Sequence, residues 1–452
     1  MILKERKETG IVIDTTKGKQ TVTLVAGIDA GSTETRVSLV NQSDFEELLN
    51  PTSAEKTLEV IDSMYVIPST FAVLEDNREV LPKSINLSDN YDSTISSVSI
   101  AAEKPYIQKH RIIRGQKIKD AVGSVERFLD SSTPKTSNQI FYINVLDSIG
   151  YGILQKYSGN IPNSVNLYLC LSVRPNELGV KFKNELMDNL KGTFHFTWNN
   201  NKGDKVSLEI NILLINLTTE PEAQIEGSTA MYDLIVDALS NKDTPLTPEE
   251  HAQLQEATDV SEILYEAVPH LHMEGGGSSI GTEYVQIDDQ GSPVLMSACS
   301  RTFNIGGNYV MRTLKDKLRE YKGRLVSDST AYTALVTGYI KNGRQKDDVL
   351  DYVKEVKETI ARIIFEKLMH EVIDVNSDIV LTEIGYISMS GRLFSKGENG
   401  ISIADYFSDL IHEVSPNTTV IRLPRNFIPQ GNALRLLNTY EVFSENNENE
   451  NK

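Results

Sequence analysis

The hydrophobic residues of this chain follow two periods. Runs rich in β-branched and apolar residues predict strands at 21–28, 35–41, 67–73, 165–173, 207–217 and 385–389. Apolar residues at helical spacing predict helices over 139–157, 222–238, 307–321 and 347–373. Segments 282–287 and 293–298 flank an Asp-Asp-Gln-Gly turn and predict a β-hairpin. Strands that alternate with helices in this way indicate an α/β fold.

Three segments fall outside this pattern. Residues 1–20 carry mixed charges without periodicity, and we expect a flexible leader there. The Asn/Glu-rich segment 444–452 has nothing to bury, so we expect a disordered tail. Residues 241–268 look like an insertion. Within it, Thr247-Pro248-Glu249-Glu250 is a capping box that predicts the start of a helix.

Composition and charge exclude several classes of function. The 452 residues include 45 Lys and Arg against 63 Asp and Glu, a net charge of −18. We therefore expect no general nucleic-acid binding, although the basic segment 104–119 offers a local site for an acidic adaptor or subunit, or is simply a solvated strand pair. No apolar run approaches the roughly 20 residues of a membrane span. Cys170 and Cys299 lie far apart, so we expect no disulfide framework and a cytoplasmic location.

The first candidate for chemistry is the segment from Gly27 to Arg36. A strand ends in the carboxylate of Asp29, turns through Gly31-Ser32-Thr33 and returns as a strand. The backbone N–H groups and hydroxyls of such a tip can bind an anion, and the carboxylate can hold hydrated Mg²⁺. Arg36 can point back at the same phosphate oxygens. The alternative is a β-turn without a ligand.

The second candidate, Glu274 to Gly281, repeats this plan with a Gly-Gly-Gly-Ser tip. No P-loop string occurs, and a dinucleotide fingerprint that starts at Gly275 fails at its sixth position, Ile280. The string Gly277-Ser278-Ser279-Ile280-Gly281 fits a nucleophile elbow, but that motif needs a following helix, whereas a strand is expected here. A chain that builds the same plan twice can bind a triphosphate from two sides.

Together these motifs resemble the actin-like ATPase superfamily. Asp29 to Arg36 is similar to its first phosphate motif and Glu274 to Ser279 to its second, where the family usually has Asp in place of Glu274. Smaller matches follow in the same order as in the family: Pro68-Ser69, Val122-Gly123, Gly306-Gly307, Ser390-Gly391 and Pro429 to Ala433. Pro221-Glu222, after a strand, is similar to the ParM-type plasmid-partitioning actins, in which the matching Glu orients water. The alternative is that Pro221 only begins a helix, with Glu220 and Glu222 favourable at its N-terminus.

The resemblance implies an actin-like two-domain α/β fold with a nucleotide cleft. We expect domain I over 21–215, closed by a C-terminal helix over 429–443, and domain II over 216–428. Mg²⁺-ATP, or GTP, is the implied cofactor, with Asp29 as metal ligand. The implied catalytic residues are Glu222 (or Glu220), Glu274 and Asp29. The implied nucleotide-binding residues are Gly31, Ser32, Thr33, Arg36, Gly276, Gly277, Ser278, Gly306, Gly307, Ser390 and Gly391.

By the same resemblance, we expect a bacterial-type ATPase that polymerises with itself into filaments. Hydrolysis would control filament turnover, and a DNA-binding adaptor protein would link the filament to plasmid DNA for segregation. The alternatives are a small-molecule kinase and a non-polymerising scaffold or chaperone ATPase of the same superfamily. His270, His272 and Glu274 alternate along one strand and are also a possible transition-metal set.

Overall fold

The chain divides by its own contacts into two compact units. The computed structural model describes residues 21–31, 34–69, 71–73, 97–104, 107–113, 125–126, 139–157, 161–199, 205–290, 293–323, 325–342, 345–377, 379–440 and 442–443. Unit 1 comprises residues 1–173, 177–261 and 427–452, and unit 2 comprises 174–176 and 262–426. The expected leader and tail, as well as Ser32 and Thr33, lie outside the described residues.

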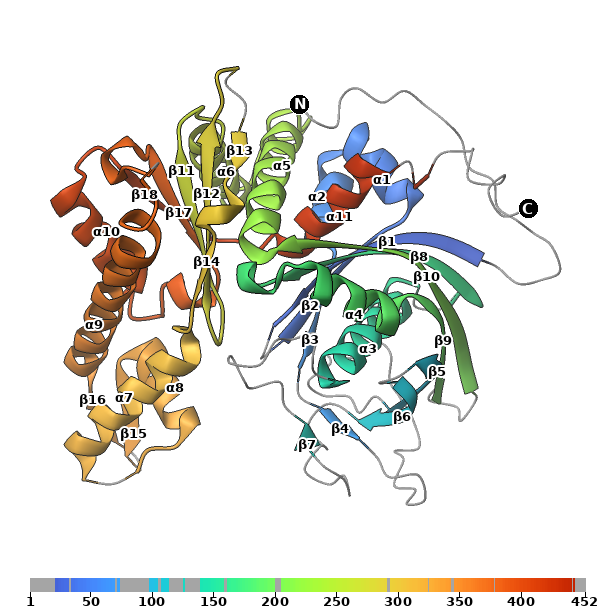
Figure 1. Ribbon diagram of the computed structural model, residues 1–452, viewed down its shortest axis with the longest axis horizontal. Helices are drawn as coiled ribbons and strands as arrows, with labels where there is room; N and C mark the ends of the chain where they lie inside the picture. The colour runs from blue at the N-terminus through green and yellow to red at the C-terminus, as the bar shows by residue number, and fades with distance from the viewer. Residues whose placement is uncertain are drawn as a thin grey trace. The chain divides into compact units, whose positions relative to one another are not determined.

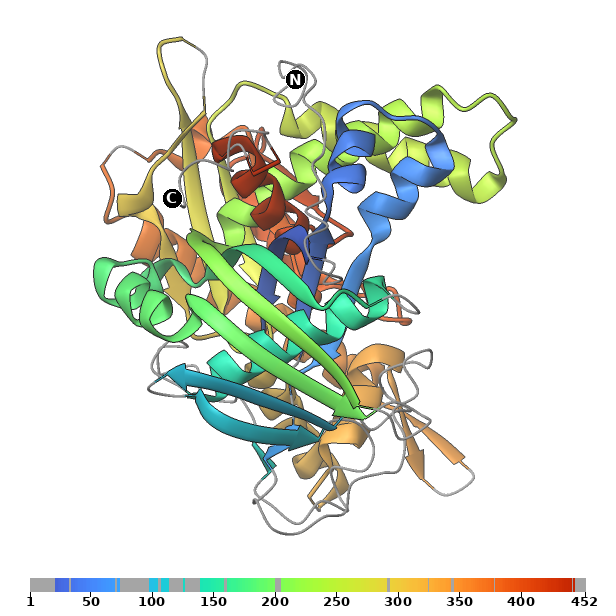
Figure 2. The ribbon, with the colours of Figure 1, turned by 90° about the vertical axis from the view of Figure 1, so that its right-hand side faces the viewer.

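Unit 1 contains a ten-stranded sheet in the order β3-β2-β1-β8-β10-β9-β5-β6-β4-β7 (Figure 1). Within it, β1 (Thr21–Ala30) pairs antiparallel with β2 (Glu34–Val40) and parallel with β8 (Ser164–Val173). The other strands are β3 (Met64–Pro68), β4 (Phe71–Val73), β5 (Ser97–Lys104), β6 (Ile107–Ile113), β7 (Val125–Glu126), β9 (Gly192–Asn199) and β10 (Lys205–Thr219). In Figure 2 the long green strands β9 and β10 are followed across the sheet by the teal strands β5 and β6.

Helices cover both faces of this sheet because its central strands are apolar on both faces. Leu24, Ala26 and Ile28 of β1 join a core with α3 (Gln139–Lys156) and α4 (Val180–Leu190). Val25, which points to the opposite face, packs with α11 (Ile428–Thr439). Two short helices, α1 (Gln42–Leu49) and α2 (Ala54–Asp62), follow β2.

Helix α5 (Glu220–Ser240) crosses α11 at two glycines. A Cβ atom on Gly431 would lie 1.9 Å from the carbonyl oxygen of Ala223, and one on Gly227 would lie 2.2 Å from that of Phe427. This close crossing places α5, with α6 (Pro248–Leu264) up to Ser261, in unit 1. The contact-based grouping therefore differs from the expected domain boundary between residues 215 and 216.

Unit 2 contains a second sheet in the order β13-β12-β11-β17-β18, with β14 paired to β12. Its strands are β11 (His270–Gly275), β12 (Ile280–Ile287), β13 (Pro293–Leu295), β14 (Arg301–Phe303), β17 (Tyr386–Ser390) and β18 (Thr419–Arg422). Leu271 and Met273 of β11 join a core with apolar residues of α7 (Gly307–Lys322), α9 (Leu350–Leu368) and α10 (Ile403–Val414). The unit also holds α8 (Asp328–Thr337) and the hairpin β15 (Tyr339–Asn342) and β16 (Gln345–Asp348).

Most of the predicted elements are confirmed. The predicted capping box is present, since the Thr247 hydroxyl accepts from the Glu250 N–H at 3.2 Å and the Thr247 N–H donates to the Glu250 carboxylate at 2.8 Å. The strand predicted over 67–73 forms two strands, β3 and β4, and the helix predicted over 347–373 begins later, at Leu350 after β16. Among the helices of the described residues, none is long and apolar enough to span a membrane.

Candidate functional site

The first loop joins β1 to β2 as the sequence predicts. Asp29 pairs with Arg36 across the two strands, and its side chain is mostly buried. The Arg36 guanidinium lies 3.3 Å from the Asp29 carboxylate and also forms an ion pair with Glu34. The Gly31 N–H donates to the Glu34 carbonyl at 3.0 Å and closes the hairpin. A carboxylate and a guanidinium therefore lie side by side at the mouth of a tight turn.

Helix α11 contacts the end of β1 from the face of the sheet opposite to α3 and α4. The Asn432 amide donates to the Ile28 carbonyl at 2.8 Å, and the Ser172 hydroxyl donates to the same carbonyl at 3.3 Å. The helix lies so close that a Cβ atom on Gly27 would be 1.8 Å from the Pro429 carbonyl oxygen. The Pro429–Ala433 segment thus lies against the strand that carries Asp29.

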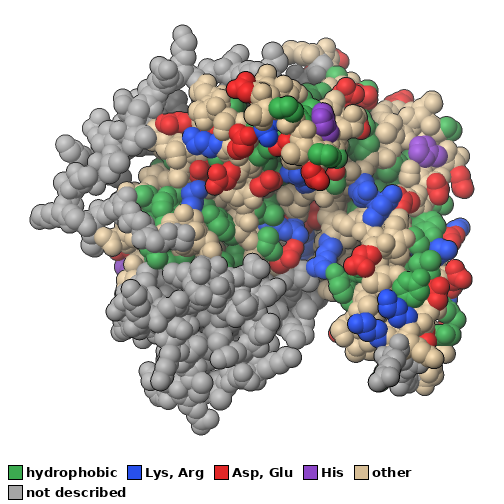
Figure 3. Space-filling view, turned by 180° about the vertical axis from the view of Figure 1, so that it is seen from behind, with side chains coloured by type: hydrophobic (Ala, Val, Ile, Leu, Met, Phe, Trp, Pro, Cys, Tyr) green, Lys and Arg blue, Asp and Glu red, His purple; other side chains and the backbone are tan. Residues whose placement is uncertain are grey.

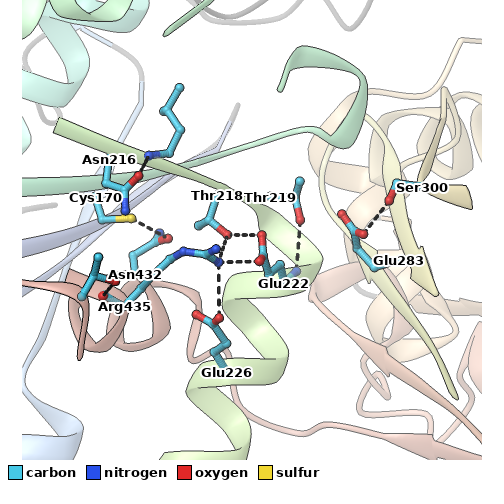
Figure 4. A network of polar contacts seen from close by, with 12 residues as sticks. Cys170, Asn216, Thr218, Thr219, Glu222, Glu226, Glu283, Ser300, Asn432 and Arg435 are labelled. Atoms are coloured by element: carbon cyan, nitrogen blue, oxygen red, sulfur yellow. Dashed lines mark hydrogen bonds and ion pairs between the residues drawn. The ribbon is translucent and has the colours of Figure 1, made fainter. Parts of the chain in front are cut away.

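The expected water-orienting glutamate, Glu222, lies in the first turn of α5 and already has binding partners within unit 1 (Figure 4). The Glu222 carboxylate accepts from Arg435 at 2.5 Å and from the Thr218 hydroxyl at 2.6 Å. Arg435 also contacts Thr218 at 3.0 Å and Glu226 at 3.3 Å. The neighbouring alternative, Glu220, is 8% exposed at the start of the same helix.

The second loop joins β11 to β12 in unit 2. Glu274 pairs with Gly281 across the strands, and the Gly276 N–H donates to the Ser279 carbonyl at 2.9 Å. This is the same hairpin closure as in the first loop.

Helix α7 begins directly against this second loop. The N–H groups of Gly307 and Asn308 donate to the carbonyls of Gly276 and Gly277 at 3.1 and 2.8 Å. A Cβ atom on Gly306 would lie 2.5 Å from the carbonyl carbon of Ser278, so only glycine fits there. The predicted residues Gly306 and Gly307 are therefore brought together with Gly276, Gly277 and Ser278.

Gly391 approaches the second loop from β17. Its φ of +90° lies in the region that favours glycine. A Cβ atom there would lie 2.5 Å from a Glu274 carboxylate oxygen and 2.5 Å from the Gly275 carbonyl. Ser390 pairs with Glu274 in the parallel β11–β17 ladder. The exposed Arg392 guanidinium follows and lies 5.2 Å from the centre of the Tyr332 ring.

The alternating histidines of β11 pack into the sheet. Burial lowers the pKa of His272 to about 3, so this imidazole is neutral at physiological pH. Its two nitrogens lie 2.8 Å from the Ser388 hydroxyl and 3.2 Å from the Ser390 hydroxyl. His270 stacks on Tyr386 with 4.5 Å between ring centres. In the part of the chain that the structure describes, no three His, Cys, Asp or Glu side chains are grouped to hold a metal ion.

The donor set of the first loop fits Mg²⁺ that arrives with a nucleotide. Mg²⁺ in such sites typically has one or two protein carboxylates and takes its other ligands from phosphate and water. Asp29 supplies one carboxylate, and Arg36 beside it can neutralise an anion. Asp29 is therefore the residue that would hold the ion.

Apart from Glu220 and Glu222 in the first turn of α5, the expected residues thus form two groups, one in each unit. Asp29, Gly31 and Arg36 lie at the first loop. The unit 2 group consists of Glu274, Gly276, Gly277, Ser278, Gly306, Gly307, Ser390 and Gly391. Sequence reasoning missed Arg435, which pairs with Glu222, and Asn144 of α3, whose amide donates to the Ser69 hydroxyl at 3.3 Å. For Asn144 a signal existed, because it is a polar residue within the otherwise apolar stretch 140–146.

Sequence comparison identifies no relative: no protein-family profile and no curated protein matches the chain. Comparison of structures gives clear matches. A ParM from Clostridium botulinum, in a 15-stranded filament, has a TM-score of 0.56 and 14% identity, over 93% of this chain and all of that one. An archaeal actin homolog has a TM-score of 0.55 and 15% identity, over 91% of this chain and 97% of the other. ParM from Bacillus thuringiensis with ATP has a TM-score of 0.53 and 11% identity, over 92% of this chain and 98% of the other.

Both the motif order and these whole-chain matches point to the same architecture. At sequence identities of 11–15%, these matches show a shared fold and do not show a shared activity. The chain has the two-domain α/β fold of the actin-like proteins and resembles ParM.

Proposed function

We propose that this protein is an actin-like ATPase that binds Mg²⁺-ATP, polymerises with itself and hydrolyses the nucleotide to control filament turnover. One observation carries the proposal. Each unit contains an antiparallel hairpin whose first strand ends in a buried carboxylate, Asp29 or Glu274, followed by a glycine-containing tip. Duplicated hairpins of this kind suit a ligand with several phosphate groups.

In this proposal the residues of the first loop hold the inner phosphates. Asp29 holds Mg²⁺, whose positive charge offsets the negative charge of the phosphates. Gly31, Ser32, Thr33 and Arg36 bind the β-phosphate through N–H, hydroxyl and guanidinium donors.

The residues of the second loop bind the end of the nucleotide that reacts. Gly276, Gly277 and Ser278 bind the γ-phosphate, and Glu274 assists metal or water. Ser390 and Gly391 border the adenosine, with Gly306 and Gly307 nearby. Glu220 or Glu222 orients the attacking water. The contacts of Glu222 with Arg435 and Thr218 favour Glu220 for this role.

The structural neighbours support the cellular part of the proposal. One is a ParM filament and another is a ParM with ATP. We propose that a nucleotide engaged by both loops favours the polymerising shape of the subunit, and that hydrolysis loosens the filament. By likeness to ParM, the cargo is plasmid DNA bound through an adaptor protein. The basic side chains of 104–119 that were considered for such a contact are not among those that the structure describes.

Light scattering by the purified protein tests this function. We expect scattering to rise above a critical protein concentration with Mg²⁺-ATP or Mg²⁺-GTP and to stay flat without nucleotide, with pelleting as a check. Asp29→Ala should abolish the rise because it removes the metal ligand. Asp351→Ala, which removes an almost fully exposed carboxylate of α9, is the matched control and should behave as wild type. A flat trace from wild-type protein that still binds nucleotide would refute polymerisation.

A further inference from the structure

A buried polar network lies beneath the first loop. Its members are Thr35 of β2, Ser69 after β3 and Asn144 of α3, and each is at most 2% exposed. The Ser69 hydroxyl donates to the Gly31 carbonyl at 2.7 Å and lies 3.3 Å from the Thr35 hydroxyl. The Asn144 amide donates to Ser69 at 3.3 Å and also to Thr35. Side chains of β2, of the residue after β3 and of α3 thus meet beneath the loop, and the Ser69 hydroxyl binds the Gly31 carbonyl.

This network is not optimal for stability. Asn144 lies among Phe141, Ile143, Val145 and Leu146, which are buried in the core. Its side-chain carbonyl oxygen is buried and has no hydrogen-bond partner among the described residues. Leaving such an atom unpaired costs about 1–3 kcal/mol. The two hydrogen bonds that the Asn144 amide donates offset this cost, so the amide gives little net stability over an apolar side chain of similar size.

The network does control the orientation of a peptide group in the loop. The Gly31 N–H is bound to the Glu34 carbonyl and the Gly31 carbonyl to Ser69, so both polar groups of this residue are fixed. These two contacts fix Gly31 at the point where β1 leads into the proposed phosphate-binding loop.

We propose that Ser69 and Asn144 are positioning residues that orient the first loop for the phosphate groups of a nucleotide. Ser69 holds the Gly31 carbonyl, and Asn144 holds Ser69 and Thr35 in place. Neither residue contacts the ligand. This inference rests on the proposed nucleotide binding.

The test compares ligand affinity with stability in four variants. We expect Ser69→Ala and Asn144→Leu to weaken binding of Mg²⁺-ATP and Mg²⁺-ADP about tenfold, the effect of one lost hydrogen bond. Binding of adenosine, which has no phosphate, should be unchanged. Ser69→Thr keeps the hydroxyl and should bind as wild type does. Ser148→Ala is the matched control, since Ser148 is equally buried, one turn further along α3, and its hydroxyl has no partner among the described residues.

Urea unfolding without nucleotide separates positioning from folding. Asn144→Leu should unfold at about the same urea concentration as wild type, because the loss of two hydrogen bonds is offset by removal of the unpaired oxygen. Ser69→Ala and Asn144→Leu proteins that bind Mg²⁺-ATP as wild type does would overturn the positioning role alone. An equal loss of adenosine and ATP binding would show a general structural role and would also overturn the positioning role. Wild-type protein that binds no Mg²⁺-ATP would instead refute the proposed function on which the inference rests.

Discussion

At the start of α5, two neighbouring glutamates have different surroundings. Glu222 forms an ion pair with Arg435 and accepts from the Thr218 hydroxyl, whereas Glu220 is the first residue of the helix and is 8% exposed. The Glu222–Arg435 pair joins α5 to α11, next to the two glycines at which these helices cross. The local sequence, Thr-Glu-Pro-Glu, does not distinguish the two acids, because either one is favourable at a helix N-terminus.

Substitution of each glutamate should separate their roles. Glu222→Gln should lower the free energy of unfolding by about 1–2 kcal/mol, because Arg435 loses the nearer of the two carboxylates that it contacts. Its ATP turnover should change little. Glu220→Gln should lower turnover about a hundredfold with unchanged ATP affinity, as expected when a base that orients water is lost.

Urea unfolding and steady-state ATP hydrolysis measure these two effects. Glu226→Gln is the control, since Glu226 contacts Arg435 at the longer distance of 3.3 Å and should have a smaller effect on stability. Loss of turnover in Glu222→Gln without loss of stability would reverse the assignment and return the water-orienting role to Glu222.

At the scale of elements, a single carboxylate joins α1 to α2. Glu47 of α1 accepts from the Thr52 N–H at 2.8 Å, the Thr52 hydroxyl at 2.6 Å and the Thr57 hydroxyl at 2.9 Å, and Lys56 lies 3.1 Å away. Burial alone would raise the pKa of Glu47, but the hydrogen bonds from Thr52, Lys56 and Thr57 outweigh it and lower the pKa to about 2. The short helices α1 and α2 depend on this contact because both are marginal in isolation.

The contribution of Glu47 should depend on pH. Because its pKa is lower in the folded state, the folded state is stabilised above the unfolded value of 4.5, and this stabilisation is lost as the pH falls towards about 2. Glu47→Gln should reduce the free energy of unfolding by about 2 kcal/mol at pH 7. The difference from wild type should shrink steadily below pH 4.5.

Urea unfolding over a pH series measures this difference. Glu46→Gln, at the exposed preceding position of α1, should show no such pH dependence. A difference between Glu47→Gln and wild type that stays constant below pH 4.5 would contradict the assigned role of the ionised carboxylate.

At the scale of the molecule, charge opposes self-association. Each copy carries a net charge of −18. On the face shown in Figure 3, the red acidic and blue basic side chains of the described residues are interspersed, and neither sign forms one continuous patch. Copies of the chain should therefore repel one another through their net charge more than they attract through local patches.

Salt should accordingly promote polymerisation. Raising the ionic strength from about 0.01 M to about 0.1 M shortens the screening length from about 30 Å to about 10 Å. We expect the critical concentration in Mg²⁺-ATP to fall several-fold over this range, as measured by light scattering and pelleting. A critical concentration that rises with salt would show instead that complementary charges dominate the contact between copies.

The elements that neighbouring residues form could be predicted from the sequence alone. An apolar run, a carboxylate, a glycine-containing tip and a returning strand are neighbours in the chain, so the two hairpins at Asp29 and Glu274 could be predicted from period and turn chemistry. The order of these motifs also predicted the actin-like fold, which the structural matches confirm.

Contacts between residues that are distant in the sequence depend on the tertiary structure. Asn144 lies 75 positions from Ser69, and Arg435 lies 217 from Thr218, and no local pattern encodes either pair. Their contacts depend on which strands are neighbours in the sheet and on how closely α5 and α11 cross at Gly227 and Gly431. Packing of whole elements sets these distances, whereas periodicity along the chain sets only the elements themselves.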